Sequence, residues 1–111
     1  MRVYERGQSH LYCGHWNGSP VEIGMSAAPL YEIPAGEVRH YHDYHEYYVM
    51  LEGRATLEVE GIIVPLIAGA IVMVEPGERH QIVAVDPREG ARWAIIKERS
   101  LPESKHVVSD H

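Results

Sequence analysis

The sequence has little that would stabilise it covalently or place it in a membrane. A single cysteine, Cys13, among 111 residues excludes an intrachain disulfide. The opening residues 1–6 lack the apolar core of a secretory signal peptide. The longest apolar stretch, residues 62–74, is too short to span a bilayer and is interrupted by Pro65 and Gly69. We therefore expect a cytoplasmic protein.

Positive charge is also scarce. Ten Lys and Arg residues against 16 Asp and Glu give a net charge of -6, which works against binding to nucleic acid or to an anionic membrane. No basic run offsets this balance, so a small molecule is the partner that we expect. No internal repeat, low-complexity run or linker divides the chain, and its length suits one domain over residues 1–111.

Helical periodicity is missing as well, and the chain reads as a series of short strands separated by glycine or proline turns. Between residues 54 and 60 the alternation is clean, with Ala55, Leu57 and Val59 on one face. We predict turns at residues 34–36, 52–53, 60–61 and 75–77, and strands near residues 3–4, 10–12, 21–26, 30–33, 47–51, 54–60, 62–64, 70–74, 80–85 and 92–98. This pattern predicts an all-β sandwich or barrel.

Residues 40–46 carry the most specific chemical signal in the chain. His40 and His42 lie two apart, so in an extended strand both imidazoles project from the same face while Tyr41 points away. A break at residues 43–45 lets the chain bend and bring the Glu46 carboxylate to the open side of the two rings. Two imidazoles and one carboxylate suit a divalent transition metal.

His80 is the candidate for a fourth ligand. Gly69 precedes the apolar run at residues 70–74, the turn at residues 75–77 follows, and His80 opens the next strand. A barrel can place His80 beside the first cluster on a neighbouring inner face.

These residues resemble the two motifs of the cupin superfamily. His40, His42, Glu46 and Gly53 match the core of G-x5-H-x-H-x(3,4)-E-x6-G, and Gly69, Gly77 and His80 match G-x5-P-x-G-x2-H-x3-N, with fifteen residues between Gly53 and Gly69. The chain departs from the pattern in three places: Gly36 lies four residues before His40, Glu75 precedes a displaced Pro76, and Ala84 replaces the asparagine.

The resemblance implies a single-domain cupin jelly-roll β-barrel, also called a double-stranded β-helix. N-terminal strands would occupy residues 1–20, the conserved barrel residues 21–99 and a C-terminal arm residues 100–111. It also implies one divalent transition metal per chain (Mn, Fe, Ni, Zn or Cu), held by His40, His42, Glu46 and His80. Because strands such as residues 47–51 are apolar on both faces, we expect a homodimer packed through one sheet.

Several functions remain open at this point. The leading hypothesis is an enzyme that binds a sugar derivative or a hydroxy or keto acid to the metal for isomerase, lyase or decarboxylase chemistry. The alternatives are a ferrous-iron dioxygenase, a non-catalytic cupin that binds a small ligand, and a metal-free cupin that uses its histidines for acid-base chemistry. His45 and Tyr48 are candidate catalytic residues, although His45 can equally replace a ligand or face water. Any basic side chain facing inward, from the set Arg39, Arg54, Arg79, Arg92 and Lys97, would be an anchor for a substrate carboxylate.

Overall fold

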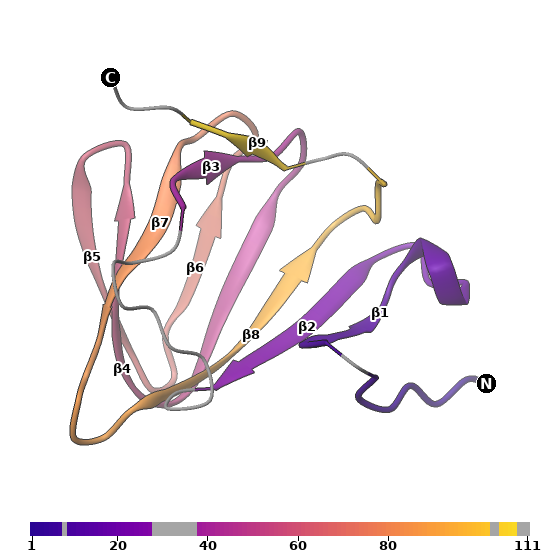
Figure 1. Cartoon of the computed structure of the whole chain (residues 1–111), viewed down its shortest axis with the longest axis horizontal. Coiled ribbons are helices and arrows are strands. Elements are labelled where there is room, and N and C mark those ends of the chain that lie inside the picture. The colour runs from indigo at the N-terminus through magenta and orange to yellow at the C-terminus, as the bar shows by residue number, and fades with distance from the viewer. Residues whose placement is uncertain (8, 28–37, 103–104, 109–111) are drawn as a thin grey trace.

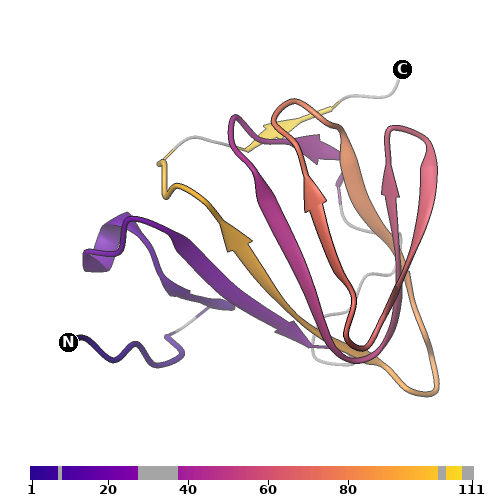
Figure 2. The ribbon, with the colours of Figure 1, turned by 180° about the vertical axis from the view of Figure 1, so that it is seen from behind.

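The computed structural model describes residues 1–7, 9–27, 38–102 and 105–108 of the chain. Antiparallel strands form two sheets that curl towards each other as a half-barrel (Figures 1 and 2), so the all-β prediction is confirmed. The described elements are β1 (Leu11–Cys13), the 3-10 turn η1 (His15–Asn17), β2 (Glu22–Ala27), β3 (His40–Tyr41), β4 (Glu46–Val59), β5 (Ile62–Ile67), β6 (Ile71–Val74), β7 (His80–Val85), β8 (Ala91–Lys97) and β9 (His106–Val107). Within the described residues, no helix is long and apolar enough to cross a membrane.

Strand β4 belongs to both sheets. Its first half pairs with β6 and β8, which continues the order to β2 and β1 and makes the first sheet. Its second half pairs with β5 and β7, which continues to β3 and β9 and makes the second sheet. The two sheets are thus joined through one continuous strand.

The predicted turn at residues 52–53 is wrong, because β4 bends at Gly53 without reversing. Gly53 has a φ of 75°, and the register of β4 against β8 shifts between Met50 and Glu52. A Cβ on Gly53 would clash with the carbonyl oxygen of Gly90, which accepts a hydrogen bond from the Arg54 N–H at 3.0 Å. Only glycine provides both the positive φ and the room for this close approach.

The other turns and strands mostly follow the sequence. Glu60 and Gly61, with φ values of 49° and 83°, form the predicted hairpin turn between β4 and β5, and the turn at residues 75–77 joins β6 to β7. Residues 3–4 form no strand, so that expectation is wrong. The strand expected at residues 30–33, the turn at residues 34–36 and Gly36 itself lie outside the described residues.

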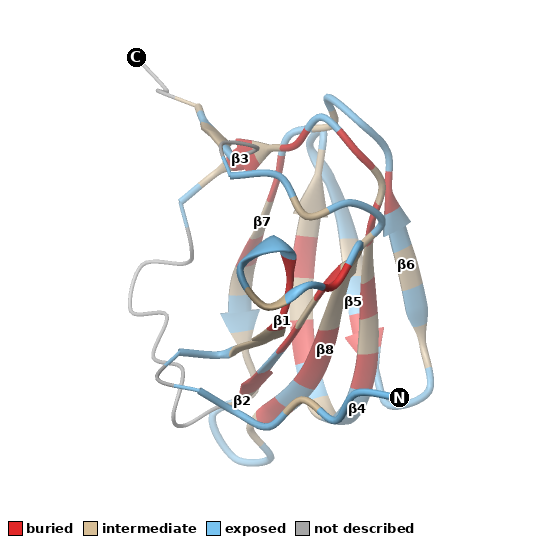
Figure 3. Ribbon diagram, turned by 90° about the vertical axis from the view of Figure 1, so that its right-hand side faces the viewer, coloured by how far each residue is buried: buried red, intermediate tan, exposed pale blue. Residues whose placement is uncertain are grey.

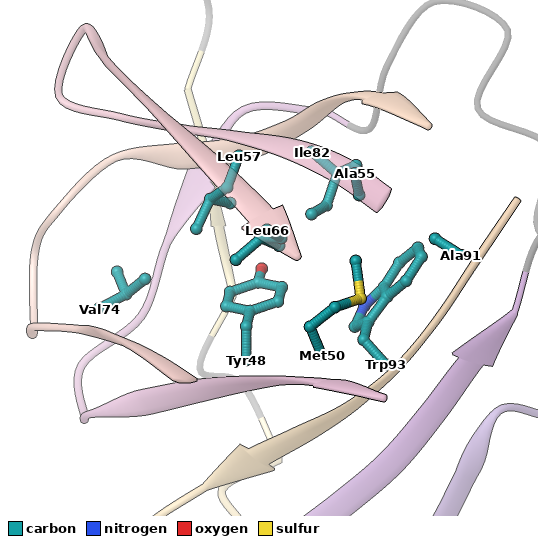
Figure 4. Close-up of a cluster of buried hydrophobic side chains, with 9 residues drawn as sticks. All are labelled: Tyr48, Met50, Ala55, Leu57, Leu66, Val74, Ile82, Ala91 and Trp93. Atoms are coloured by element: carbon teal, nitrogen blue, oxygen red, sulfur yellow. The ribbon is translucent and has the colours of Figure 1, made fainter. Parts of the chain in front are cut away.

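The hydrophobic core fills the space between the two sheets (Figure 4). Side chains from both halves of β4 meet there with those of the neighbouring strands: Tyr48, Met50, Ala55, Leu57, Leu66, Val74, Ile82, Ala91 and Trp93. Buried residues alternate with more exposed ones along β4, as Figure 3 shows, and the predicted inward face of residues 54–60 is confirmed by the burial of Ala55 and Leu57.

The outer face of the first sheet is also apolar. Two rows cross strands β6, β4, β8 and β2 on this face, namely Met73, Tyr47, Ile96 and Ile23, and Ile71, Val49, Ala94 and Met25. Ile71, Met73 and Met25 are exposed there. Neither row contains a charged residue.

Candidate metal centre

Two of the four predicted ligands face each other across neighbouring strands. His40 on β3 and His80 on β7 are paired in register, and both side chains are buried at the inner face of the second sheet. Their ring centroids are 4.4 Å apart. The intervening residue Tyr41 is only partly buried, as the predicted alternation requires.

The irregular segment after β3 delivers the other two. The chain leaves the strand after Tyr41, and Glu46 opens β4 in the first sheet. The Glu46 carboxylate spans both remaining histidines, with Oε1 2.9 Å from His80 Nε2 and Oε2 3.3 Å from His42 Nε2. One donor atom from each of the residues His40, His42, Glu46 and His80 lies within 4.8 Å of the others, and all four side chains are buried. The structure therefore brings together the complete predicted set.

A backbone hydrogen bond ties the two motifs to each other. The N–H of Gly77, in the turn before β7, donates to the carbonyl oxygen of His42 at 2.9 Å. On the other side of β7, Arg79 and Glu60 are joined by backbone and side-chain hydrogen bonds of 2.9 and 2.7 Å. Backbone contacts thus help to fix the positions of His42 and His80.

The outer nitrogen of each histidine ring has a partner that turns the inner nitrogen towards the cluster. Nδ1 of His40 lies 2.7 Å from the Val38 carbonyl oxygen, and Nδ1 of His80 lies 2.9 Å from that of Glu78. Nδ1 of His42 lies 3.2 Å from the hydroxyl of Tyr44, whose ring stacks on the imidazole at 5.1 Å. Such contacts orient metal-binding histidines in proteins.

This arrangement leaves a place for a cation. A carbonyl oxygen only accepts hydrogen bonds, so Nδ1 of His80 carries its hydrogen, and a neutral His80 ring would present a lone pair at Nε2. Nε2 lies 2.9 Å from a carboxylate oxygen of Glu46, a contact that requires a proton or a metal ion between the two atoms. A metal about 2.1 Å from each donor places neighbouring donors about 3 Å apart and opposite donors about 4.2 Å apart. The cluster and its nitrogen and oxygen donors fit a divalent transition metal.

The protonation states also suit a metal. Burial, with a smaller contribution from the His80 and His42 rings, lowers the pKa of His40 to about 4, although its hydrogen bond to Val38 acts in the opposite direction. Burial alone would raise the pKa of Glu46, but the hydrogen bonds from His42 and His80 outweigh it and hold the pKa below its usual range. At neutral pH, His40 is neutral and Glu46 is ionised, as metal ligation requires.

A cavity of about 100 Å³ adjoins the cluster, enough for an ion and roughly two or three groups the size of water. Lys97 lies on its wall, and its Nζ is 2.6 Å from Oε2 of Glu22. Burial alone would lower the pKa of Lys97, but the hydrogen bond to Glu22 and the electrostatic effects of Tyr44, Glu22 and Glu46 together outweigh it and raise the pKa. The sequence predicts an inward basic residue without identifying it as Lys97, and it gives no prediction for Glu22. Both residues could have been found from the alternation of their strands, because each occupies an inward position.

A wider hollow of about 640 Å³ continues outwards from this cavity. Four residues line both spaces, namely Leu11, Glu22, Lys97 and Lys105. Lys97 and Glu22 therefore lie where the two spaces adjoin.

The two candidate catalytic residues lie in different surroundings. Tyr48 lines the cavity, and the edge of its ring meets His80 at a centroid distance of 6.0 Å. His45 lies at the surface, where its ring and its backbone N–H both contact Glu98 Oε1 at 2.9 Å, and it does not line the cavity. Ala84, at the position of the motif asparagine, is exposed near the opposite end of β7.

Comparison with known proteins agrees with this geometry. A sequence model described as a cupin domain matches residues 29–97, more than half of the chain. No curated protein matches the chain.

Solved structures share the fold. A protein from Planctomyces limnophilus is 27% identical over 85% of this chain and 76% of its own, with a TM-score of 0.63. A cupin family protein with a double-stranded β-helix fold from Methanocaldococcus jannaschii gives a TM-score of 0.70 at 17% identity, over 89% of this chain and 91% of its own. A polyketide cyclase from Streptomyces resistomycificus gives 0.66 at 17% identity, over 85% and 65% of the two chains. The expected jelly-roll architecture is confirmed.

Proposed function

The chain belongs to the cupin domain family, and from this premise we propose that it is a metal-dependent enzyme acting on a small oxygenated metabolite. One divalent transition metal would be held by His40, His42, Glu46 and His80. The reaction class that we propose is isomerase, lyase or decarboxylase chemistry on a sugar derivative or a hydroxy or keto acid. The observation that carries the proposal is the convergence of these donors beside a cavity, with His80 Nε2 2.9 Å from a carboxylate oxygen of Glu46.

The charge of the site suits a substrate that becomes more negative as it reacts. Three neutral imidazoles and one carboxylate leave a divalent ion with a net charge near +1, which favours a bound anion or a developing enolate. When bound, the metal would act as a Lewis acid that polarises a carbonyl or lowers the pKa of a bound water.

The protein's own residues supply orientation and exclusion of water. The Val38 and Glu78 carbonyl oxygens fix the rings of His40 and His80, and Tyr44 fixes that of His42. Tyr48 closes the cavity on the side of the hydrophobic core. A four-ligand site of this kind leaves one or two positions of a five- or six-coordinate ion for substrate oxygens.

Metal analysis of the natively isolated protein tests the first half of the proposal. We expect about one divalent transition metal per chain. His42→Ala should lose it, whereas the matched variant His45→Ala, which removes a surface histidine three residues away, should retain it. Circular dichroism would show that both variants are folded. A folded His42→Ala protein with a full complement of metal would contradict the assignment.

Turnover of hydroxy acids, keto acids and sugar derivatives by the metal-loaded protein tests the second half. A non-redox reaction proceeds equally with and without oxygen, so a rate that stops under anaerobic conditions would instead identify a dioxygenase. A ligand that binds and is recovered unchanged after many hours would point to a non-catalytic binding protein.

A further inference from the structure

One row of charged side chains crosses the inner face of the first sheet. In the antiparallel register, Lys97 on β8 is opposite Glu46 on β4 and also opposite Glu22 on β2. The next inward row contains Tyr48, Ile95 and Gly24, and the one after it Met50, Trp93 and Ser26. The charges are therefore confined to the row that adjoins the candidate metal centre.

The lysines of the chain are concentrated at this cavity. The sequence contains only two, Lys97 and Lys105, and both line it, while every other residue in the Lys and Arg count is an arginine. Both also line the outer hollow, so the two side chains lie where the inner cavity and the hollow adjoin. The two positive charges of these ammonium groups exceed the single negative charge of Glu22 where the two spaces adjoin.

Lys97 is held in place and keeps donors available. Its side chain is largely buried, and the contact with Glu22 fixes its Nζ. An ammonium group carries three N–H donors. Glu22 accepts one of these N–H donors and is the residue bonded to Nζ among those that the structure describes. Two donors are therefore left for a ligand.

From this geometry we propose that Lys97, positioned by Glu22, selects substrates that carry a carboxylate beyond the atoms that bind the metal. The inference rests on the proposed function and narrows its substrate class from oxygenated metabolites in general to acids with a second anionic group. Charge-assisted hydrogen bonds from a fixed ammonium group to such a carboxylate are strong in a site shielded from water. A neutral sugar has no carboxylate and would form no such charge-assisted hydrogen bond between two charged groups with Lys97.

Two probes with the same metal-binding group test the proposal. Malate and lactate both offer one hydroxyl and one carboxylate to a metal, and malate adds a second carboxylate. Their affinities for the metal-loaded protein would be measured by isothermal titration calorimetry. We expect malate to bind about tenfold tighter or more, the range of a charged hydrogen bond.

The variant Lys97→Met combined with Glu22→Gln removes the ion pair without leaving a buried carboxylate alone. It should retain the metal and bind both probes equally. Arg54→Met, which removes one positive charge from an exposed position, should keep the preference of the natural protein for malate. Metal content is measured for every sample.

The outcomes separate this inference from the proposed function. Metal-loaded natural protein without a preference for malate, or a preference that survives in the double variant, would overturn the role of Lys97 and leave the metal site intact. Natural protein that takes up no metal would overturn the proposed function and the inference with it.

Discussion

Tyr44→Phe is the most direct test of how the protein orients a metal ligand. The hydroxyl of Tyr44 lies 3.2 Å from Nδ1 of His42, and the tyrosine ring stacks on the imidazole with an interplanar angle of 10°. The substitution removes the hydroxyl and keeps the buried ring, so the packing around His42 is retained. With a metal on Nε2, the Nδ1–H of His42 loses its acceptor and the ring loses its fixed orientation. Removing such a partner typically weakens metal binding about 10- to 100-fold, or roughly 1.4–2.7 kcal/mol.

The assay is competition for the metal against a chromogenic chelator, with circular dichroism as the check on folding. Loss of the buried hydrogen bond should lower the free energy of unfolding by only about 1 kcal/mol, so the fold survives. Tyr47→Phe is the matched control, because Tyr47 lies on the outer face of the first sheet and this variant should bind metal as the natural protein does. Equal metal affinity in Tyr44→Phe and the natural protein would refute the idea that the hydroxyl orients His42.

Three further predictions concern stability and assembly. Gly53→Ala should lower the free energy of unfolding by about 3 kcal/mol in urea titrations, because strain at positive φ is added to the clash with Gly90; Gly61→Ala, at φ 83° with open space, should cost only about 1–2 kcal/mol. In metal-free protein, the pKa of His40 is about 4 in the folded state and 6.5 in the unfolded state, so unfolded chains bind more protons between these values. The free energy of unfolding should therefore fall by about 3 kcal/mol as the pH drops through this interval. The His40→Gln variant should lack this effect. Light scattering should find a homodimer packed through the apolar outer face of the first sheet, and Met73→Glu should give monomers; a natural protein that is monomeric at high concentration would contradict this.

The metal site could be predicted from the sequence because the patterns that indicate it lie within two short segments of the chain. Alternation along an extended chain predicts His40 and His42 on one face, and both are buried in the cluster although β3 ends at Tyr41. The spacing of His80 from the turn at residues 75–77 predicts it as the fourth ligand, and in the structure Gly77 of this turn donates a hydrogen bond to the carbonyl oxygen of His42. Short-range patterns and motif spacing were sufficient here.

The features that could not be predicted depend on residues far apart in the chain. Glu52 and Gly53 look like a hairpin turn, because a glycine with positive φ serves a turn and a bend equally well. The choice is made by Gly90, whose carbonyl oxygen receives the Arg54 N–H. In the same way, the periodicity of β8 places Lys97 on the inner face, but nothing in that segment shows that Glu22 is its neighbour.

A register shift in β4 beside the bend at Gly53 also decides which side chains of this strand reach the site. In the first half of the strand the buried residues are the even-numbered Glu46, Tyr48 and Met50, whereas in the second half they are the odd-numbered Ala55 and Leu57. Strict alternation along an uninterrupted strand would put one of these two sets on the outside. The register shift between Met50 and Glu52 changes the parity, so that the Glu46 carboxylate and the core residues beneath it face the same interior. The extra residue at Leu51, two positions before the glycine that closes the first motif, thus lets the Glu46 carboxylate project to the same side as the core residues of the second half of the strand.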